Sequence, residues 1–180
     1  MRLTADQLRQ CMPLCPAAHV DEYARLLSET MTQSEINTVA RAACYLGQLA
    51  HESGELRYLE ELADGSAYEL RRDLGNVQEG WGRLYKGRGW IQLTGRLNYE
   101  LAGVALGVDL VGTPRLAAEP ATAACVAAWY WRTHGCSLLA DGMDVPGITR
   151  AINGGLTHLA ERQAATDRAL AALVRTAVIA

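Results

Sequence analysis

The feature that most constrains the fold is a break in pattern at Gly54. Before it, apolar residues between Ile36 and Ala50 recur at intervals of three and four, which predicts a helix that Gly54 ends. After it, glycines at positions 65, 75, 80, 82, 87 and 89 interrupt the chain, and no long helical period survives. We therefore expect loops and a small antiparallel sheet in this stretch, with residues 89–93 as one strand.

Helices are predicted on both sides of this glycine-rich stretch. Before it we expect helices over residues 4–11, with Thr4 as N-cap, and 19–30, and one that begins at Ser34. After it we expect helices over 97–105, 120–133 and 159–178, the second starting favourably with Pro120. The chain has no repeat or linker-like segment, so the expected fold is mainly α (α+β). We expect a single domain, 1–180, that consists of a helical lobe (1–53 and 96–180) and a small sheet lobe (54–95) with a cleft between them.

Composition excludes several classes of protein. A length of 180 residues with 49% hydrophobic residues suits one substantial core. The net charge of −3 argues against nucleic acid as a partner. The sequence contains no apolar run of about 18 residues, so we expect no membrane insertion. Basic residues do gather locally, and either a solvated face or contact with an anionic polymer would explain them: Arg71, Arg72, Arg83, Lys86, Arg88 and Arg96.

The N-terminus and the cysteines bear on compartment and metal binding. Residues 1–6 lack the apolar core of a secretory signal, so we expect a cytoplasmic protein that is released later. An odd number of cysteines favours reduced, mostly buried thiols over disulfides: Cys11, Cys15, Cys44, Cys125 and Cys136. Cys11 and Cys15 lack a second Cys/His pair at zinc spacing, so no metal site is predicted.

Glu52 and Glu61 are the candidate catalytic pair. They are nine residues apart, so one continuous helix would place them on opposite sides, and they can face each other only if the chain folds back after Gly54. Two carboxyl groups across a scissile bond are what glycoside hydrolysis requires, although solvated surface carboxylates are the simpler interpretation of each alone. His51-Glu52 does not begin a zinc-protease helix, because position 55 is Glu55 rather than a second histidine.

Four polar residues further along have simple structural explanations. Gln92 and Thr94 alternate on the expected strand, so ordinary strand pairing accounts for them, with both side chains on one face. Asn153 begins an Asn-Gly-Gly turn, and Arg162 reads as a surface helix residue.

A resemblance over longer stretches of sequence favours functional roles for these residues over the simple structural explanations. The run from Leu49 to Tyr99 resembles the family-19 chitinase-like glycoside hydrolases, in particular the compact endolysins of phages and prophages. The matching words are Gln48-Leu49-Ala50-His51-Glu52-Ser53, Leu59-Glu60-Glu61-Leu62, Gly65-Ser66-Ala67-Tyr68-Glu69, Asp73-Leu74-Gly75-Asn76, Tyr85-Lys86-Gly87-Arg88-Gly89, Ile91-Gln92-Leu93-Thr94-Gly95-Arg96-Leu97-Asn98-Tyr99, Ala151-Ile152-Asn153-Gly154-Gly155 and Ala160-Glu161-Arg162.

The resemblance implies a lysozyme-like catalytic domain and assigns roles by position. Glu52 matches the general acid, Glu61 the general base, and Thr94 the hydroxyl that helps to hold the attacking water. Substrate contacts are expected from Gln92, Asn98 and Asn153, from Arg162, which orients the acid by its charge, and from His51, Tyr85 and Arg88 within the matching words. One departure is visible: plant chitinases pair that arginine with a glutamate at the position that is Thr157 here.

The function we expect is endo-hydrolysis of the β-1,4 glycan of bacterial peptidoglycan with inversion. Glu52 would need an apolar wall to stay protonated, Glu61 a polar loop to stay ionised, and the pair a separation of about 6.5–9.5 Å. Trp81, Tyr85 and Trp90 would either stack on sugars or pack in the core. No metal or organic cofactor is implied.

Several alternatives to this function stay open. They are a chitinase, a lytic transglycosylase, an antibacterial effector and a non-catalytic glycan-binding module. We expect a monomeric endolysin, released through a separate pore-forming protein.

Overall fold

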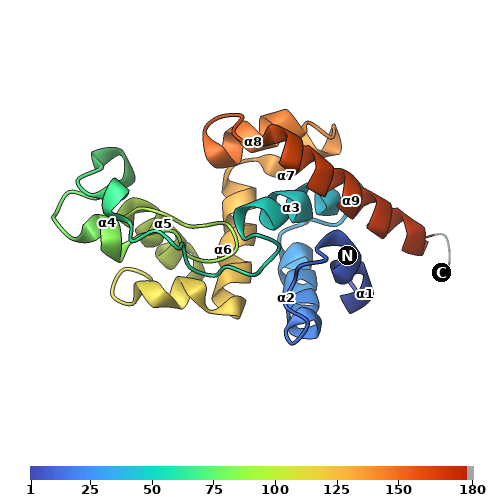
Figure 1. Cartoon of the computed structure of the whole chain (residues 1–180), viewed down its shortest axis with the longest axis horizontal. Helices are drawn as coiled ribbons and strands as arrows, with labels where there is room; N and C mark the ends of the chain where they lie inside the picture. The colour runs from blue at the N-terminus through green and yellow to red at the C-terminus, as the bar shows by residue number, and fades with distance from the viewer. Residues whose placement is uncertain (178–180) are drawn as a thin grey trace. The chain divides into compact units, whose positions relative to one another are not determined.

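The structure is a computed structural model that describes residues 1–177, with side chains through Arg175. It is mainly helical (Figure 1). The α-helices are α1 (Ala5–Cys11), α2 (Val20–Gln33), α3 (Val39–Glu52), α4 (Trp81–Leu84), α5 (Arg96–Leu106), α6 (Pro120–Thr133), α7 (Cys136–Asp141), α8 (Val145–Asn153) and α9 (Leu159–Ala177). The short 3-10 helices are η1 (Ser66–Tyr68), η2 (Arg72–Leu74) and η3 (Pro114–Ala118).

Contacts divide the chain into two compact units. The first comprises residues 1–57 and the described residues from Tyr130 onward, and the second comprises residues 58–129. The second unit therefore includes residues 96–129, which the sequence analysis assigned to the helical lobe. The predicted single domain with a cleft stays a prediction, and each unit is described by itself.

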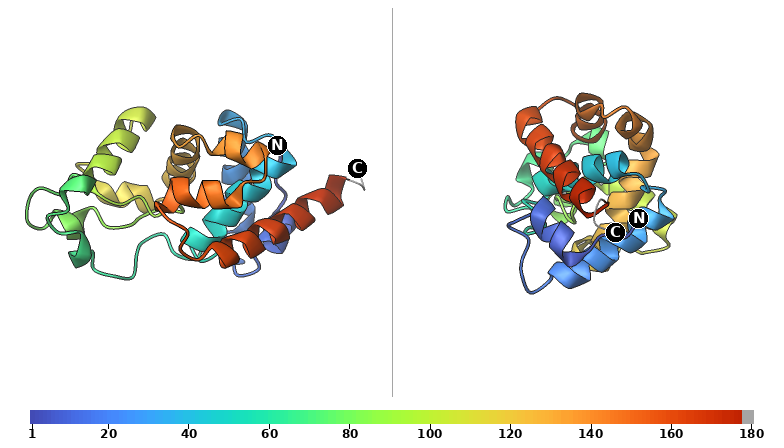
Figure 2. Two further views of the ribbon diagram at one scale, coloured as in Figure 1. Left: turned by 90° about the horizontal axis from the view of Figure 1, so that it is seen from above. Right: turned by 90° about the vertical axis from the view of Figure 1, so that its right-hand side faces the viewer.

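The first unit is built on the pair α3 and α9, which lie side by side in both views of the chain (Figure 2). Every residue of α3 from Ala42 to Ala50 is buried. Small side chains allow the close approach: a Cβ added to Gly47 would lie 2.2 Å from Oγ1 and 2.8 Å from the backbone of Thr166 on α9. The tight packing expected from the small residues of this helix is thus present.

Local signals explain where the helices of the first unit begin and end. The hydroxyl of Thr4 accepts a hydrogen bond from the amide of Gln7 and caps α1, as predicted. The third helix begins at Val39 rather than Ser34, because Thr38 is its N-cap: the Thr38 side chain accepts a hydrogen bond from the backbone amide of Arg41. It ends at Glu52, and Gly54 follows in the left-handed conformation with φ 57°, which a glycine adopts without strain.

The second unit contains no sheet, so the predicted antiparallel-sheet lobe is wrong. Within the described residues only isolated bridges form, between Glu60 and Arg88 and between Arg88 and Leu93. The predicted strand over residues 89–93 is a tight turn instead. Gly89 (φ 75°) and Gln92 (φ 54°) both adopt left-handed conformations, which no extended strand contains. The glycine-rich sequence therefore encodes turns that are held by side chains rather than by strand pairing.

The core of the second unit is aromatic. Trp90 and Tyr99 are fully buried, so Trp90 packs in the core rather than on the surface. Gly89 lies against η3 and α6, where a Cβ would come within 2.7 Å of the carbonyl oxygen of Ala117. This contact fixes the position of the turn that precedes Thr94.

Three further expectations meet the structure as follows. The helix predicted for residues 120–133 is α6, and Val178, the predicted end of the last helix, lies outside the described residues. Cys11, Cys15, Cys44 and Cys136 are buried and Cys125 is half-buried, and all five are free thiols. In the part of the chain that the structure describes, we find no helix with the length and apolarity needed to cross a membrane.

Candidate active-site residues

Glu52, the predicted acid, is the last residue of α3 and is held by a buried cation. Nη2 of Arg162 on α9 donates a hydrogen bond to Oε1 of Glu52 at 2.6 Å. The Arg162 side chain is 2% exposed and that of Glu52 is 17% exposed, so the pair is largely withdrawn from solvent. The apolar wall expected around Glu52 is therefore interrupted by a charged partner. Arg162 is not the surface residue that its helical position suggested.

The Arg162 guanidinium is shared among three acceptors. Besides Glu52, it donates from Nη1 to Oε1 of Gln48 at 2.6 Å and from Nε to the carbonyl oxygen of Thr157 at 3.3 Å. A buried cation is tolerated when its donors are satisfied in this way. Thr157 thus contributes its backbone carbonyl oxygen as an acceptor. The neutral side-chain amide of Gln48 accepts the hydrogen bond from the second guanidinium nitrogen.

Sequence reasoning missed Gln48 as a site residue. The signal was its place four residues before Glu52, which puts both side chains on one face of α3. Its amide nitrogen also donates to Oγ1 of Thr149 on α8 at 3.4 Å, which links three helices through one side chain.

His51 lies beside Glu52 in sequence but faces another part of the first unit. It lines a pocket of about 300 Å³ between α3 and α9, together with Glu55 and Arg168. Its ring lies 5.1 Å from that of His158. Burial lowers the pKa of His51, and the positive charge of Arg162 lowers it further. A lowered pKa favours neutral imidazole, which can accept a hydrogen bond from a ligand hydroxyl.

Two further residues of the first unit, Asn153 and Tyr130, belong to α8 and α6. Asn153 is the exposed last residue of α8, and Gly154 ends that helix in the left-handed conformation, so the predicted turn is present. Tyr130 donates its hydroxyl to the carbonyl oxygen of Ile152 at 3.3 Å. Burial raises the pKa of Tyr130 and the negative charge of Glu52 raises it further, which identifies Tyr130 as a neighbour that the sequence did not reveal.

Glu61, the predicted base, lies in the second unit in a polar loop, as expected. Its Oε1 accepts the hydroxyl of Tyr68 at 3.0 Å, and its Oε2 accepts the amide of Gly87 at 3.1 Å. Its own backbone amide donates to the carbonyl oxygen of Gly87 at 2.9 Å. Each carboxyl oxygen is therefore held by a different donor.

Gly87 is the point on which the predicted residues of the second unit converge. A Cβ added there would lie 2.7 Å from Oε1 of Gln92, 3.2 Å from Oε2 of Glu61 and 3.3 Å from Oγ1 of Thr94. The turn at residues 89–92, rather than a strand, brings Gln92 and Thr94 to the same place. The hydroxyl of Thr94 donates to the carbonyl oxygen of Gln92 at 2.8 Å, so its lone pairs remain available to accept. A carboxylate, a hydroxyl and an amide around one small space can bind and deprotonate a water molecule.

The remaining predicted residues of the second unit have supporting positions. Asn98 donates from Nδ2 to the carbonyl oxygen of Thr94 at 2.8 Å. Tyr85 and Arg88 are only 3% and 5% exposed. Tyr85 donates to the carbonyl oxygen of Val111, and Arg88 donates to that of Leu84. The structure therefore places Tyr85 and Arg88 in the interior rather than at a substrate-facing surface.

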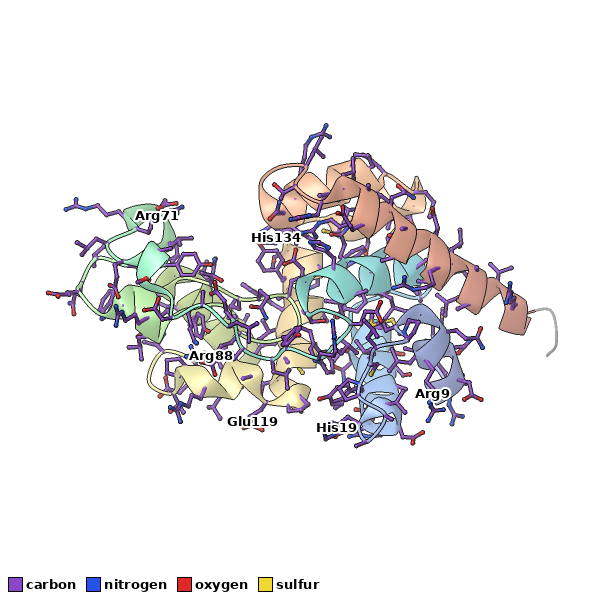
Figure 3. The ribbon with its side chains drawn as sticks, in the orientation of Figure 1. Arg9, His19, Arg71, Arg88, Glu119 and His134 are labelled. Carbon is purple, nitrogen blue, oxygen red and sulfur yellow. The ribbon has the colours of Figure 1, made fainter. Side chains whose placement is uncertain are left out.

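The local basic cluster is compensated by acidic partners. Arg71, labelled in Figure 3, extends into solvent and pairs with Asp73. The other ion pairs are Arg83–Asp64, Lys86–Glu60, Arg88–Glu60 and Arg96–Glu100. Most of these cations are thus paired with a nearby carboxylate, and Arg88 is buried as well. Pairs at an exposed surface contribute little free energy. The described residues also contain no group of three or more His, Cys, Asp or Glu side chains arranged to hold a metal ion.

The chain is similar in sequence to chitinases and to a family 19 glycosyl hydrolase. Among curated proteins, the chain is 34% identical over 131 residues to acidic endochitinase SP2 of Beta vulgaris, covering 70% of this chain and 44% of that protein. It is 37% identical over 102 residues to a glycosyl hydrolase family 19 domain-containing protein of Haemophilus influenzae, covering 57% and 49%. The chain thus spans less than half the length of these relatives.

Solved structures agree in fold. Chitinase C of Streptomyces griseus matches with a TM-score of 0.78 and 24% identity, covering 95% of this chain and 92% of that one. A class IV chitinase of Zea mays matches with a TM-score of 0.63 and 20% identity, covering 89% and 81%. The sequence profile described as chitinase class I matches residues 24–140, well over half of the chain. The chain therefore belongs to glycoside hydrolase family 19.

Proposed function

We propose that this chain is a glycosidase that cleaves β-1,4-linked glycans with inversion, with Glu52 as general acid and Glu61 as general base. One observation carries the proposal: Glu61, Thr94 and Gln92 bring a carboxylate, a hydroxyl and an amide within 3.3 Å of the point where a Gly87 Cβ would lie. Membership of the family and the Arg162–Glu52 pair add support.

The base half of the reaction follows from the second unit. A water between Glu61 and Thr94 donates one hydrogen to the carboxylate and the other to the Thr94 hydroxyl oxygen. Its lone pair is then directed at the anomeric carbon. As the carbon–oxygen bond forms, Glu61 takes the first proton. Tyr68 and the Gly87 amide already hold the carboxylate, so little reorganisation is needed.

The acid half follows from the first unit. Protonated Glu52 gives its proton to the glycosidic oxygen as the bond to the leaving sugar breaks, and becomes a carboxylate. The negative charge develops next to Arg162, which is fixed by Gln48 and the Thr157 carbonyl. Because that attraction grows as the proton leaves, Arg162 stabilises the transition state more than the ground state. Inversion further requires that the two carboxyl groups stand about 6.5–9.5 Å apart across the bound sugar.

The roles are tested by replacing each acid with its amide. Glu52→Gln and Glu61→Gln should each lower kcat by about 10²–10⁴-fold, because each removes a proton-transfer group. Release of reducing ends from purified glycan measures the rate. Glu29→Gln is a matched control, since Glu29 forms only an exposed pair with Arg25 among its described ion pairs. A Glu52→Gln enzyme with native turnover would show that the assignment is wrong.

For the substrate, we propose the glycan strand of bacterial peptidoglycan, as in an endolysin released through a separate pore-forming protein. The support is the resemblance of the matching words to the compact endolysins. Chitin is the second candidate, favoured by curated relatives that are named endochitinases. Parallel assays on purified cell walls and on chitin oligosaccharides distinguish them. Mass spectrometry of the products would reveal 1,6-anhydro ends if the chain were a lytic transglycosylase instead.

A further inference from the structure

We infer that Tyr68 is a positioning residue for the base: its hydroxyl orients the Glu61 carboxylate. The inference rests on the proposed function of Glu61 and adds a residue that acts through it. The hydroxyl oxygen of Tyr68 lies 3.0 Å from Oε1 of Glu61. The two residues are seven positions apart, and the chain between them returns on itself at η1.

The backbone of Tyr68 is anchored independently of Glu61. Its amide donates to the carbonyl oxygen of Gly65 at 3.0 Å, and its carbonyl oxygen accepts Nδ2 of the fully buried Asn76 at 2.9 Å. Gly82 packs against it so closely that a Cβ there would lie 2.6 Å from the carbonyl carbon of Tyr68. A ring fixed at its base from two sides presents its hydroxyl in one direction, which is the requirement for a positioning group.

Other groups around Glu61 hold its backbone or bear on its charge. Nζ of Lys86 donates to the carbonyl oxygens of Glu61 and Ala63 at 3.0 and 3.2 Å, and it pairs with Glu60. Burial raises the pKa of Tyr99 to about 12, and the charges of Glu60 and Glu61 contribute to that rise. Lys86 therefore fixes the loop, whereas the carboxylate itself is held by Tyr68 and by the Gly87 amide. Of these two donors, the Tyr68 hydroxyl is the one that a substitution can remove without changing the backbone.

The chemistry predicts what the hydroxyl does. A carboxylate oxygen that accepts a hydrogen bond is held in one orientation, so the other lone pairs of the group point in fixed directions and one of them can accept a proton from water. With Oε1 released, the carboxylate can rotate about its terminal torsion, and the lone pair directed at the water is no longer fixed. Loss of Tyr68 should therefore lower kcat and leave substrate affinity nearly unchanged.

The experiment compares Tyr68→Phe with Tyr23→Phe. Both remove one phenolic oxygen, but Tyr23 lies on α2 in the first unit, buried and stacked on His19. For Tyr68→Phe we expect kcat to fall about tenfold with KM within about twofold, the size of one charge-assisted hydrogen bond. The second measurement needs no substrate: the ¹³C chemical shift of the Glu61 carboxyl carbon, recorded at a single neutral pH, should differ between Tyr68→Phe and the unmodified chain, because the hydrogen bond to Oε1 is lost.

The two measurements separate failure of the inference from failure of the proposed function. An unchanged ¹³C chemical shift of the Glu61 carboxyl carbon in Tyr68→Phe overturns the inference, whatever the activity of the chain. A changed chemical shift together with an unchanged kcat also overturns it, because Tyr68 would then affect Glu61 without assisting the reaction. An unmodified chain that cleaves neither glycan overturns the proposed function and with it the catalytic part of the inference. Equal effects of Tyr23→Phe would identify a general loss of packing and would likewise overturn it.

Discussion

Gly87→Ala should separate catalysis from stability in this chain. The φ of Gly87 is not in the left-handed region, so alanine is compatible with the backbone. Its methyl group would lie 2.7 Å from Oε1 of Gln92, which must retreat by about 0.7 Å to reach the 3.4 Å of ordinary contact. Glu61 and Thr94 need shifts of only a few tenths of an ångström. The methyl group would nevertheless fill the space in which the proposed water is held.

The expected cost is therefore in rate. A misplacement of about 1 Å near the reacting atoms costs about 10²-fold, so kcat should fall by about one to two orders of magnitude. The end of the Gln92 side chain is flexible, and Gly→Ala substitutions at compatible positions stabilise by about 0.4–1 kcal/mol, so the free energy of unfolding should change by less than about 1 kcal/mol.

Reducing-end release and urea denaturation measure these two quantities. Gly142→Ala is the matched control, because its Cβ meets only the Leu139 carbonyl oxygen at an ordinary 3.7 Å. Gly87→Ala with the native rate would refute the idea that water is activated beside this glycine. A large loss of stability would refute the claim that Gln92 can move away.

Three further predictions concern the first unit. Gly47→Ala should lower the free energy of unfolding in urea by at least about 1–3 kcal/mol, because its Cβ would meet the backbone of Thr166 at 2.8 Å. Arg162→Met should cost about 3–5 kcal/mol in the same assay, since it leaves Glu52 without its cation; a loss below 1 kcal/mol would contradict the buried pair. Burial lowers the pKa of His51 below its ordinary 6.5, so the stability that neutral His51 provides is complete above pH 6.5 and falls as the pH drops below it. The His51→Gln variant should lack this pH dependence when the free energy of unfolding is measured from pH 7.5 to 5.5. A slope equal to that of the unmodified chain would contradict the prediction.

The helices could be predicted from sequence because their signals are local. Apolar periodicity and capping residues such as Thr4 depend on neighbours within a few positions. The small sheet could not be predicted correctly, since glycines between short polar segments suit both hairpins and irregular turns. Only the left-handed backbone at Gly89 and Gln92 decides between them, and Gln92 is a residue for which that conformation is uncommon.

Site residues were predictable where they lie in long matching words, and their partners were not. Glu61, Gln92 and Thr94 were singled out by resemblance, and the structure brings these three together around Gly87. Tyr68 lies in a matching word as well, but its role depends on where a loop returns, which no spacing rule gives. Arg88 shows the opposite error: a basic residue in a conspicuous word was taken for a ligand contact, and it is buried.

The first unit connects the packing of two helices to the chemistry of one acid. Gly47 lets α9 approach α3 at Thr166, four residues after Arg162 and thus one helical turn away. One residue beyond Gly47, Gln48 meets Arg162, and one turn further Glu52 meets it again. The closeness of the helices therefore sets the position of the guanidinium relative to the carboxyl group. A larger side chain at position 47 would displace the cation from the acid as well as loosen the core, so the small residues of α3 serve the proposed reaction through the geometry of packing.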